Sequence, residues 1–569
     1  MFESGKVRTE LTWTGKKKKI EKLPELPFQT AEIVNETRKR TLDTYPISYP
    51  EDKGYNLLIW GDNKLVMNSL LKDFEGKITL IYIDPPFATG ADFKMPIKIE
   101  EEKLIKEPSG IEIKAYRDTW GKGLASYLQM MYDRLVLMKK LLAENGSIYV
   151  HMDWHVGHYV KLIMDEIFGR ENFRNEIVWC YAGGAIPKTD FPRKHDVILR
   201  YTKTENFTFI PPMRPYSPTG SGVHSDGSRY DKEKGETPHN DWWVDIDPVN
   251  TMSKERINFP TQKPEKLLER IILASSNEGD IVADFFVGSG TTLAVAEKLG
   301  RRWIGCDLSK YAIQVTRKRL LDIPGCKPFK ILNLGMYQKH KLMENGIKSY
   351  IDFILQLYEA TSISGYAYIH GRKGRRLIHV SSPNSFVTER EIKRALEECR
   401  SANSTGLDVL GWEFEMGLYE LIEDIGKEYG IDVKIKQIPI DILNMRKREL
   451  VNIQFFDLNY LDLDLKVEGR KVTIAINRFV LANPEYIPEE IKSSIKDFSS
   501  YIDYWAVDFD YNGDAFHNMR QEYRTRKKNK NLKTRLSYEY DKPGEYNILV
   551  KVIDIFGNDT NKILHVKVE

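Results

Sequence analysis

The sequence contains very little cysteine for its length. Among 569 residues there are 4 cysteines, and no two of them are spaced as a pair. Disulfide frameworks and structural zinc sites both need such pairs. We therefore expect neither in this chain, and we expect the four thiols to behave as small apolar groups.

Long apolar runs and a strong net charge are also missing. No stretch is apolar enough to cross a membrane, and the N-terminus lacks the apolar core of a signal peptide. The formal net charge is only +3, so total charge does not indicate a nucleic-acid partner. With 41% hydrophobic and 29% charged residues, the composition predicts a soluble globular protein of several domains, located in the cytoplasm.

Three histidines lie close together at His151, His155 and His158. Such a group suggests a metal site, but no acidic or cysteine residues follow at ligand spacing. We therefore expect no metal.

The most informative stretch is an apolar run that ends in Asp84, Pro85, Pro86 and Phe87. The run predicts a buried parallel strand, whose carboxyl end opens onto the ligand crevice of an α/β sheet. The two prolines remove two N–H donors and leave carbonyl oxygens as acceptors. Asp84 and the Pro85 carbonyl would accept the protons of an exocyclic amino group while Phe87 stacks on its ring. An ordinary turn is the alternative interpretation.

A second signal lies far downstream, where residues 281–307 predict a strand, a glycine loop, a helix and a strand ending at Asp307. Gly288 and Gly290 let the backbone approach a ligand closely, and an acid at the end of the next strand suits ribose hydroxyls. The dinucleotide pattern G-x-G-x-x-G is absent, and so is the lysine of a phosphate-binding loop. The loop therefore predicts a nucleoside ligand without a phosphate cradle.

Five motifs occur together and in order, at residues 61–63, 84–87, 146–153, 259–264 and 284–292. With the Asp-Pro-Pro-aromatic motif ahead of the glycine motif, the chain resembles the β class of amino-group DNA methyltransferases, a permuted group that includes type III modification subunits and related site-specific enzymes. Two departures are visible. Phe285 stands where the family usually has proline, and Phe87 stands where Tyr or Trp is frequent. We expect altered packing at Phe285 rather than a lost cofactor.

The resemblance implies a permuted Rossmann-like domain that transfers a methyl group from S-adenosylmethionine to the N6 amino group of adenine. The adenine must leave the DNA duplex, because its amino group is otherwise paired. Asp84, Pro85, Pro86 and Phe87 are the implied catalytic motif. The residues implied at the cofactor are Asp62, Thr261, Gln262, Lys263, Asp284, Phe286, Gly288, Gly290, Thr291 and Asp307.

Two segments are expected to contact double-stranded DNA. Residues 204–255, by their position in the family pattern, predict a target-recognition insertion, with a plain surface insertion as the alternative. Residues 524–535 are rich in Arg and Lys without an acid, which suits phosphate contacts, with a solvated loop as the alternative. The residues predicted to contact DNA are Arg214, Arg229, Tyr230, Arg524, Arg526, Lys527 and Lys528.

The chain is expected to divide into an N-terminal arm (1–50), a methyltransferase domain (51–325), a small α/β domain (326–449) and a β-rich domain (450–569). Within the second, residues 88–120 predict a substrate lid or an ornamented surface loop. The last strands of the chain suggest an immunoglobulin-like sandwich.

Three alternative functions stay open at this point. N4-cytosine methylation uses the same pocket chemistry, although Asp rather than Ser at position 84 favours adenine. A DNA-binding specificity subunit would keep the fold without turnover. A combined restriction and modification enzyme would depend on the C-terminal third. The candidate acids there have no convincing acid-x-lysine nuclease context; they are Glu413, Glu415, Asp462, Asp464 and Glu468, with Lys471. A restriction subunit and a homodimer are both compatible partners.

Overall fold

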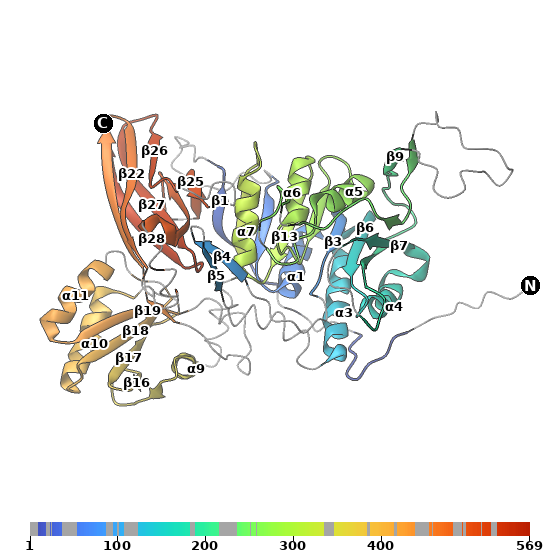
Figure 1. The fold of residues 1–569 in the computed structure, drawn as a ribbon. Coiled ribbons are helices and arrows are strands. Elements are labelled where there is room, and N and C mark those ends of the chain that lie inside the picture. The colour runs from blue at the N-terminus through green and yellow to red at the C-terminus, as the bar shows by residue number, and fades with distance from the viewer. Residues whose placement is uncertain are drawn as a thin grey trace, which may run out of the picture.

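The chain folds around one large sheet, with two smaller units toward its C-terminal end (Figure 1). The computed structural model describes residues 10–18, 23, 25–36, 54–86, 95–99, 102–106, 123–182, 188–215, 236–250, 252–257, 259–334, 346–383, 387–412, 414, 418–438, 455–457, 459–481, 487, 492, 495, 497–513, 515–524 and 532–569.

The large sheet has eleven strands. In spatial order they are β11 (Trp242–Trp243), β7 (Phe173–Cys180), β8 (His195–Thr202), β6 (Leu142–Met152), β3 (Ile78–Ile83), β12 (Ile281–Asp284), β13 (Arg302–Asp307), β2 (Asn56–Trp60), β14 (Phe329–Asn333), β1 (Gln29–Val34) and β24 (Phe516–Asn518).

The strands from β6 to β14 run parallel, and the strand order changes direction between β3 and β12. On one side the chain goes from β3 to β6, and on the other side it goes from β12 to β13. Ligands of open α/β sheets bind beyond the carboxyl ends of the strands at such a switch point. This order places the Asp84 turn and the glycine loop next to each other, although about 200 residues separate them in the sequence.

Helices cover both faces of the parallel strands, because successive residues of a strand point to opposite sides. Ile81 and Ile83 pack on one face, whereas Leu80 and Tyr82 pack on the other. The first face is covered by α1 (Asn63–Phe74), α3 (Leu124–Leu141) and α4 (Gly157–Phe168), and the second by α5 (Glu265–Ser275), α6 (Thr291–Lys298) and α7 (Lys310–Leu321).

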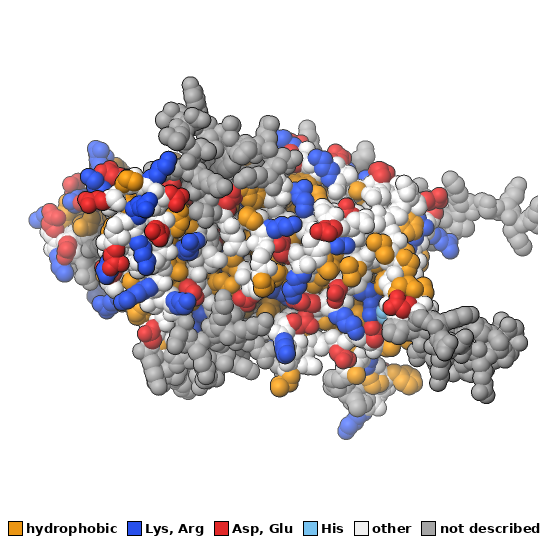
Figure 2. Space-filling model, turned by 90° about the horizontal axis from the view of Figure 1, so that it is seen from above, with side chains coloured by type: hydrophobic (Ala, Val, Ile, Leu, Met, Phe, Trp, Pro, Cys, Tyr) orange, Lys and Arg blue, Asp and Glu red, His pale blue; other side chains and the backbone are white. Residues whose placement is uncertain are grey.

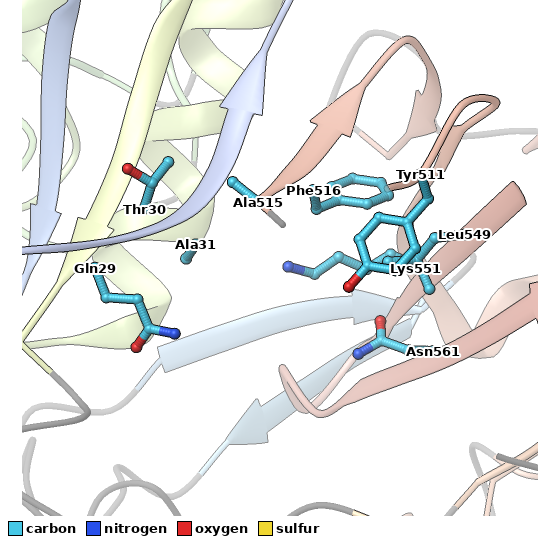
Figure 3. A pocket seen from close by; sticks show the side chains of 9 residues that line it. All are labelled: Gln29, Thr30, Ala31, Tyr511, Ala515, Phe516, Leu549, Lys551 and Asn561. Atoms are coloured by element: carbon cyan, nitrogen blue, oxygen red, sulfur yellow. The ribbon is translucent and has the colours of Figure 1, made fainter. Parts of the chain in front are cut away.

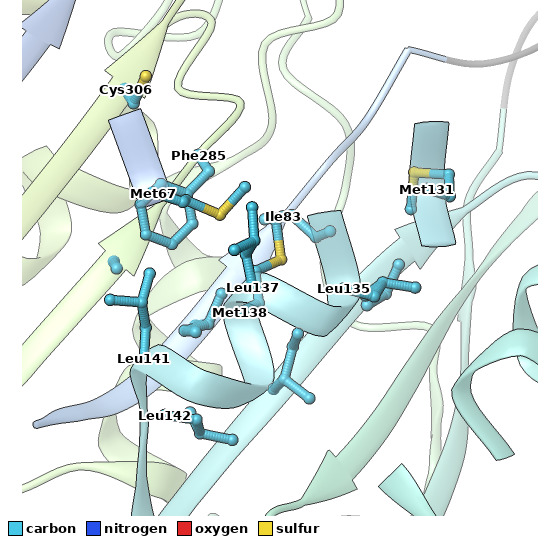
Figure 4. Close-up of a cluster of buried hydrophobic side chains, with 14 of the residues drawn as sticks. Met67, Ile83, Met131, Leu135, Leu137, Met138, Leu141, Leu142, Phe285 and Cys306 are labelled. Carbon is cyan, nitrogen blue, oxygen red and sulfur yellow. The ribbon is translucent and has the colours of Figure 1, made fainter. Parts of the chain in front are cut away.

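The core of the first face reaches directly beneath the glycine loop (Figure 4). Phe285 is fully buried there, in a cluster with Met67, Ile83, Met138 and Cys306. Full burial of such a ring contributes roughly 1.5–3 kcal/mol. The phenylalanine in the family's proline position is thus part of the core of the sheet.

Most elements expected around the five motifs are confirmed within one to five residues. One difference lies in residues 88–120, whose described parts form an antiparallel hairpin of β4 (Met95–Ile99) and β5 (Glu102–Lys106). Another lies at 204–255, where β9 (Met213–Pro215) and β10 (Glu236–Pro238) form a two-stranded ribbon. A short 3-10 helix, η1 (Arg170–Asn172), precedes β7.

The expectation of a solvated arm over residues 1–50 is wrong for part of that segment. β1 lies inside the large sheet, antiparallel to β14 and parallel to β24. Lys16 also forms an ion pair with Glu166 of α4 at 2.6 Å, although lysine-rich segments are usually solvated. These partners lie far away in the sequence, so the local composition of the segment did not reveal them.

A smaller α/β unit follows β14. Its sheet and helices are β15 (Thr361–Ser362), β16 (Gly371–Lys373), β17 (Arg376–Val380), β18 (Gly406–Gly411), β19 (Asp432–Gln437), β20 (Phe456–Asp457), α9 (Ile347–Leu357), α10 (Glu389–Ser401) and α11 (Leu418–Tyr429). The sequence pattern predicts a helix near Leu418–Tyr429, which is confirmed by α11, and a strand at 366–370, where the structure has no strand. α10 begins at a capping box in which Thr388 and Glu391 bond each other's backbone N–H groups.

The last part of the chain consists of two antiparallel sheets around one apolar core, so the expected β-rich end is confirmed. The sheets comprise β21 (Tyr460–Glu468), β22 (Lys471–Val480) and β26 (Arg535–Glu539), and β25 (Arg520–Tyr523), β23 (Ile502–Asp508), β27 (Gly544–Asp554) and β28 (Asp559–Val568), with the 3-10 helix η4 (Phe498–Tyr501) ahead of β23.

The C-terminal sheets are joined to the large sheet through a buried charged cluster. Glu32 of β1, 1% exposed, accepts hydrogen bonds from Arg317 of α7 at 3.1 Å and from Tyr504 of β23 at 2.8 Å. Lys551 of β27 approaches the same carboxylate at 3.5 Å. Beside this cluster is a hollow lined from β1 on one side and from the C-terminal strands on the other (Figure 3).

Charges of both signs are mixed over the described part of the face in Figure 2, as the small net charge suggests. None of the described helices is both long and apolar enough to cross a membrane.

Candidate active site

The Asp84 turn begins where β3 ends, at the carboxyl edge of the sheet. Pro85 is buried, while Asp84 and Pro86 are half-buried. The turn therefore packs against the protein on one side and is accessible to solvent on the other. Phe87, predicted to stack on the substrate ring, lies outside the described residues.

Lys263 joins the two predicted motifs. Its Nζ donates to Oδ2 of Asp84 at 2.5 Å, and the exposed fractions of the two side chains are only 11% and 18%. Its backbone carbonyl accepts a hydrogen bond from Thr291 Oγ1 at 3.1 Å, at the first residue of α6. One residue therefore holds the end of β3 against the start of the helix that follows the glycine loop.

The glycine loop adopts a conformation that other residues rarely accept. Gly288 has φ of 51° and Gly290 has φ of 73°. A Cβ on Gly290 would lie 2.6 Å from Oγ1 of Thr316, closer than real contacts allow. Both glycines are thus required by backbone geometry, and the loop presents bare backbone to the crevice.

Asp284 organises this loop from below. It is 2% exposed, and its carboxylate accepts hydrogen bonds from the Phe286 backbone N–H at 2.9 Å and from Thr292 Oγ1 at 2.6 Å. Burial raises the pKa of Asp284 to about 7, and the charges of Asp84 and Asp307 act in the same direction. We therefore assign Asp284 a role in shaping the loop rather than in touching a ligand.

Two further carboxylates lie at the carboxyl edge of the sheet. Asp307 ends β13, and its oxygens accept from the backbone N–H groups of Gly288 and Ser309, both at 2.8 Å. Asp62 follows β2, caps α1 through the N–H of Lys64, and has a side chain that is 40% exposed. Backbone N–H of Gly61 donates to the Asp307 carbonyl at 3.0 Å, so the two strand ends are held together.

Three residues predicted at the cofactor have most of their polar atoms engaged within the protein. Gln262 accepts from the N–H of Ile257 and donates to the carbonyl of Glu255. Thr291 is 4% exposed and accepts from Arg319 at 2.8 Å while donating to Lys263. With Asp284, these residues build the walls of the site.

Thr261 is different, because it is exposed and has φ of 61°. A β-branched residue in this region is strained, and such strain often accompanies function. The predicted Phe286 is half-buried and packs against the core below.

An aromatic pair that the sequence analysis did not single out lies beside the glycine loop. Phe259 and Tyr311 stack with their ring centroids 5.9 Å apart and their planes 15° apart. A Cβ on Gly288 would lie 3.4 Å from the Phe259 ring, so the ring borders the loop. Phe259 belongs to one of the five motifs, whereas Tyr311 carries no local signal.

A buried hydrogen-bonded chain runs behind the Asp84 turn. His151 contacts Tyr82 at 2.8 Å and Asp196 at 3.1 Å, and Asp196 also accepts from Tyr181 at 3.1 Å. Burial alone would raise the pKa of Asp196, but the His151 hydrogen bond and the charge of Lys263 lower it below its usual value. His151 is thus engaged by these partners. Among the described residues no cluster of three or more metal-ligating side chains occurs.

The predicted DNA contacts are only partly described. Arg214 lies on β9. The other strand of this ribbon, β10, leads to His239, which lies near Arg270 of α5. The ribbon is therefore at the flank of the sheet. Arg524 donates to the carbonyls of Ile502 and Ser499 at 2.8 and 2.7 Å, so its guanidinium has a structural role that we did not expect. The predicted contacts outside the described residues are Arg229, Tyr230, Arg526, Lys527 and Lys528.

The site suits a nucleoside with a positive charge. Gly288 and Gly290 form a loop of positive-φ backbone, with Gly290 packed closely against Thr316 and the Phe259 ring beside Gly288. The carboxylates of Asp307 and Asp62 lie nearby. Arg134 pairs with Asp62 at 3.2 Å and two backbone N–H groups donate to Asp307, and the oxygens keep acceptor capacity for hydroxyl groups. Asp84 and the Pro85 carbonyl form an acceptor pair on the adjacent strand. The fold and the site together define a Rossmann-like group-transfer enzyme with a nucleoside cofactor.

Comparisons with known proteins agree with this class. A family model described as DNA methylase matches residues 78–318. The type II methyltransferase M.EcaI of Enterobacter cloacae is 30% identical, over 46% of this chain and 69% of its own length. DNA adenine methyltransferase YhdJ of Escherichia coli K12 is 31% identical, over 43% and 76%. The EcoP15I Mod subunit of a type III restriction-modification enzyme of Escherichia coli is 33% identical, over 27% of each chain.

The chain belongs to the N6/N4 DNA methylase family. It is therefore a DNA methyltransferase that depends on S-adenosylmethionine. The family match ends at residue 318, ahead of the smaller α/β unit and the C-terminal sheets.

Proposed function

We propose that this enzyme methylates the N6 amino group of adenine at specific sites in duplex DNA, after flipping the base out of the helix. The observation that carries the proposal is the contact of Lys263 with both Asp84 and Thr291. That contact supports a site in which the proposed amino-group acceptor, Asp84, lies beside the proposed methyl-donor loop.

In this proposal, the cofactor is bound by residues at and around the glycine loop. The bare backbone at Gly288 and Gly290 receives it, and Asp307 and Asp62 accept hydrogen bonds from its hydroxyl and amino groups. When bound, S-adenosylmethionine supplies a methyl group on a positively charged sulfur. The Phe259 ring closes one side of the cradle and excludes water.

The Asp84 turn prepares the target nitrogen. Asp84 and the Pro85 carbonyl accept the two N–H groups of the amino group and draw its lone pair out of conjugation with the ring. Lys263 binds Oδ2 of Asp84 and fixes the orientation of the carboxylate, which leaves Oδ1 for the substrate. Because the groups are fixed before the substrate arrives, positioning supplies much of the rate. No covalent enzyme intermediate and no metal take part in this proposal.

Two observations support adenine over cytosine. Position 84 carries Asp rather than Ser. A relative with 31% identity is named a DNA adenine methyltransferase. N4-cytosine methylation is the alternative that the experiment must separate, because its amino group fits the same acceptors.

The test is to map modified bases in DNA from cells that express the protein, with Asp84→Ala expressed at equal level. We expect N6-methyladenine at one short sequence, and no modification with the variant. Asp84→Ala should still bind S-adenosylmethionine, since its side chain lies outside the cradle. N4-methylcytosine at the sites would overturn adenine specificity, and unchanged methylation by Asp84→Ala would overturn the mechanism.

We further propose that the enzyme is the modification component of a restriction system, acts in the cytoplasm on double-stranded DNA, and takes a restriction subunit or a second copy of itself as partner. The relative that is a Mod subunit supports this proposal.

We also propose that β1, 54–334 and β24 form the methyltransferase part, with 346–457 and 459–569 as two appended units. The ribbon at Arg214 and the basic segment around Arg526, Lys527 and Lys528 remain proposed DNA contacts, as do Arg229 and Tyr230.

A further inference from the structure

An exposed aromatic residue lies one strand away from the Asp84 turn and is not used by the methyl-transfer chemistry. Trp154 follows β6 and is 45% exposed. In the sheet, Ile83 pairs with Val150, so the ends of β3 and β6 reach the same edge. A large apolar side chain is therefore exposed to solvent at the mouth of the site.

Trp154 is held in place by the residues around it. The imidazole of His155 stacks on it with centroids 3.7 Å apart and planes 30° apart. His155 is fixed in turn by buried Asp153, which accepts from its backbone N–H at 3.0 Å and contacts its Nδ1 at 2.5 Å. An indole supported in this way loses little conformational entropy when it binds a flat partner.

A basic segment lies against the indole. The guanidinium carbon of Arg193 is 4.2 Å from the Trp154 ring. Arg193 precedes β8, which pairs antiparallel with β6 and so starts at the same edge. Residues 188–194 contain Lys188, Arg193 and Lys194 against one acid, and Phe191 is 94% exposed. Exposed aromatic rings among basic side chains are the composition of surfaces that bind nucleic acid.

We propose that Trp154 and Arg193 contact the substrate DNA beside the flipped nucleotide. The guanidinium moves from the indole to a phosphate, and a neighbouring base stacks on the ring face that the guanidinium leaves. This inference rests on the proposed base-flipping function. When a base leaves the duplex, the faces of its neighbours lose their stacking partner. A rigid indole at the mouth of the site replaces that partner, while the charge of Arg193 holds the strand.

The chain provides a control away from the site. Tyr366, in the smaller α/β unit, is 40% exposed. It lies outside the family match and outside both segments expected to contact DNA. Tyr366→Ala thus removes an aromatic ring of similar exposure from a different part of the surface.

The experiment measures affinity of the full chain for a short duplex with one unpaired adenine, over a series of salt concentrations and without cofactor. Trp154→Ala should weaken binding at least about fivefold with an unchanged salt slope, because stacking is uncharged. Arg193→Gln should lower the slope by about one, as expected for one lost phosphate contact. Trp154→Phe should recover most of the affinity, and Tyr366→Ala should bind like the unmodified protein.

Equal affinity of Trp154→Ala and Tyr366→Ala would overturn the stacking role, and an unchanged slope in Arg193→Gln would overturn the phosphate contact. Both substitutions are at exposed residues, and Arg193→Gln tests the surface even if Trp154→Ala fails to fold. Binding is measured without methyl transfer, so failure of adenine methylation in the base-mapping experiment leaves this result interpretable and distinct.

Discussion

Asp284 provides a quantitative test of how the glycine loop is built. Its carboxylate lies beneath the loop, and burial raises its pKa to about 7 from an ordinary value of 3.8. Asp284→Asn removes the charge and keeps the shape of the side chain. The amide oxygen can accept from the Phe286 N–H, and the amide nitrogen can donate to the Thr292 hydroxyl. We therefore expect the loop to keep its structure in this variant.

The sign of the pH effect follows from the direction of the shift. Because the pKa in the folded state lies above that in the unfolded state, the folded protein binds the proton more tightly between these values. The stability that protonation of Asp284 contributes is fully present below about pH 4, and this contribution is lost as the pH rises to 7. At about 1.36 kcal/mol per pKa unit, a rise from 3.8 to about 7 amounts to about 4 kcal/mol, of which roughly 3 kcal/mol falls between pH 5 and 7.

The assay compares the thermal unfolding midpoints of the original protein and Asp284→Asn at pH 5 and at pH 8. Relative to the original protein, the variant should gain roughly 3 kcal/mol over this range, which corresponds to about 6–12 °C for a domain of this size. Asp241→Asn, at an exposed position, controls for the loss of a surface carboxylate. A difference between Asp284→Asn and the original protein that stays constant from pH 5 to 8 would refute the buried, protonated carboxyl group.

Three further predictions test the cradle, the docking of the C-terminal sheets and the basic segment. Gly290→Ala places a Cβ 2.6 Å from Thr316 Oγ1 at a φ of 73°, so it should destabilise the domain by at least about 1 kcal/mol and abolish S-adenosylmethionine binding in calorimetry. Glu32→Gln leaves the buried charge of Arg317 unpaired and should cost about 3–5 kcal/mol, seen as faster proteolytic separation of the C-terminal sheets. Replacing the three basic residues of 526–528 by Gln should lower the salt slope of DNA binding by up to about three, and an unchanged slope would exclude that segment.

The sequence predicted the centre of the site well because its signals are local. A β-branched run followed by Asp84 and two prolines specifies a strand and a turn without reference to the rest of the chain. Gly288 and Gly290 likewise mark a backbone conformation that only glycine accepts readily. The order of strands then brings these two turns together, within the permuted Rossmann-like fold that the resemblance implied.

The contacts that connect distant segments could not be read in the same way. Lys263 belongs to a recognised motif, but its ion pair with Asp84 spans 179 positions and has no local pattern. The predicted ligands Asp284, Gln262 and Thr291 are of the right residue types. Their polar atoms are nevertheless bonded to backbone groups and to the side chains of Thr292 and Arg319. Residue type and motif position indicate that a residue belongs to a site. Only its hydrogen-bond partners show whether the side chain faces the ligand or the protein interior.

The contact between the two ends of the chain also joins distant segments, so local sequence patterns did not reveal it. Glu32 lies in a segment whose composition predicted a solvated arm, yet its carboxylate is fully enclosed by Arg317, Tyr504 and Lys551. A buried carboxylate is stable only with such partners, and they are contributed by α7, β23 and β27. Because α7 follows directly on the strand that ends at Asp307, the cluster links the C-terminal sheets to the element behind the cofactor cradle. The C-terminal sheets are therefore anchored on the catalytic domain rather than attached by a linker alone, and DNA held by these sheets would reach the site in a fixed orientation.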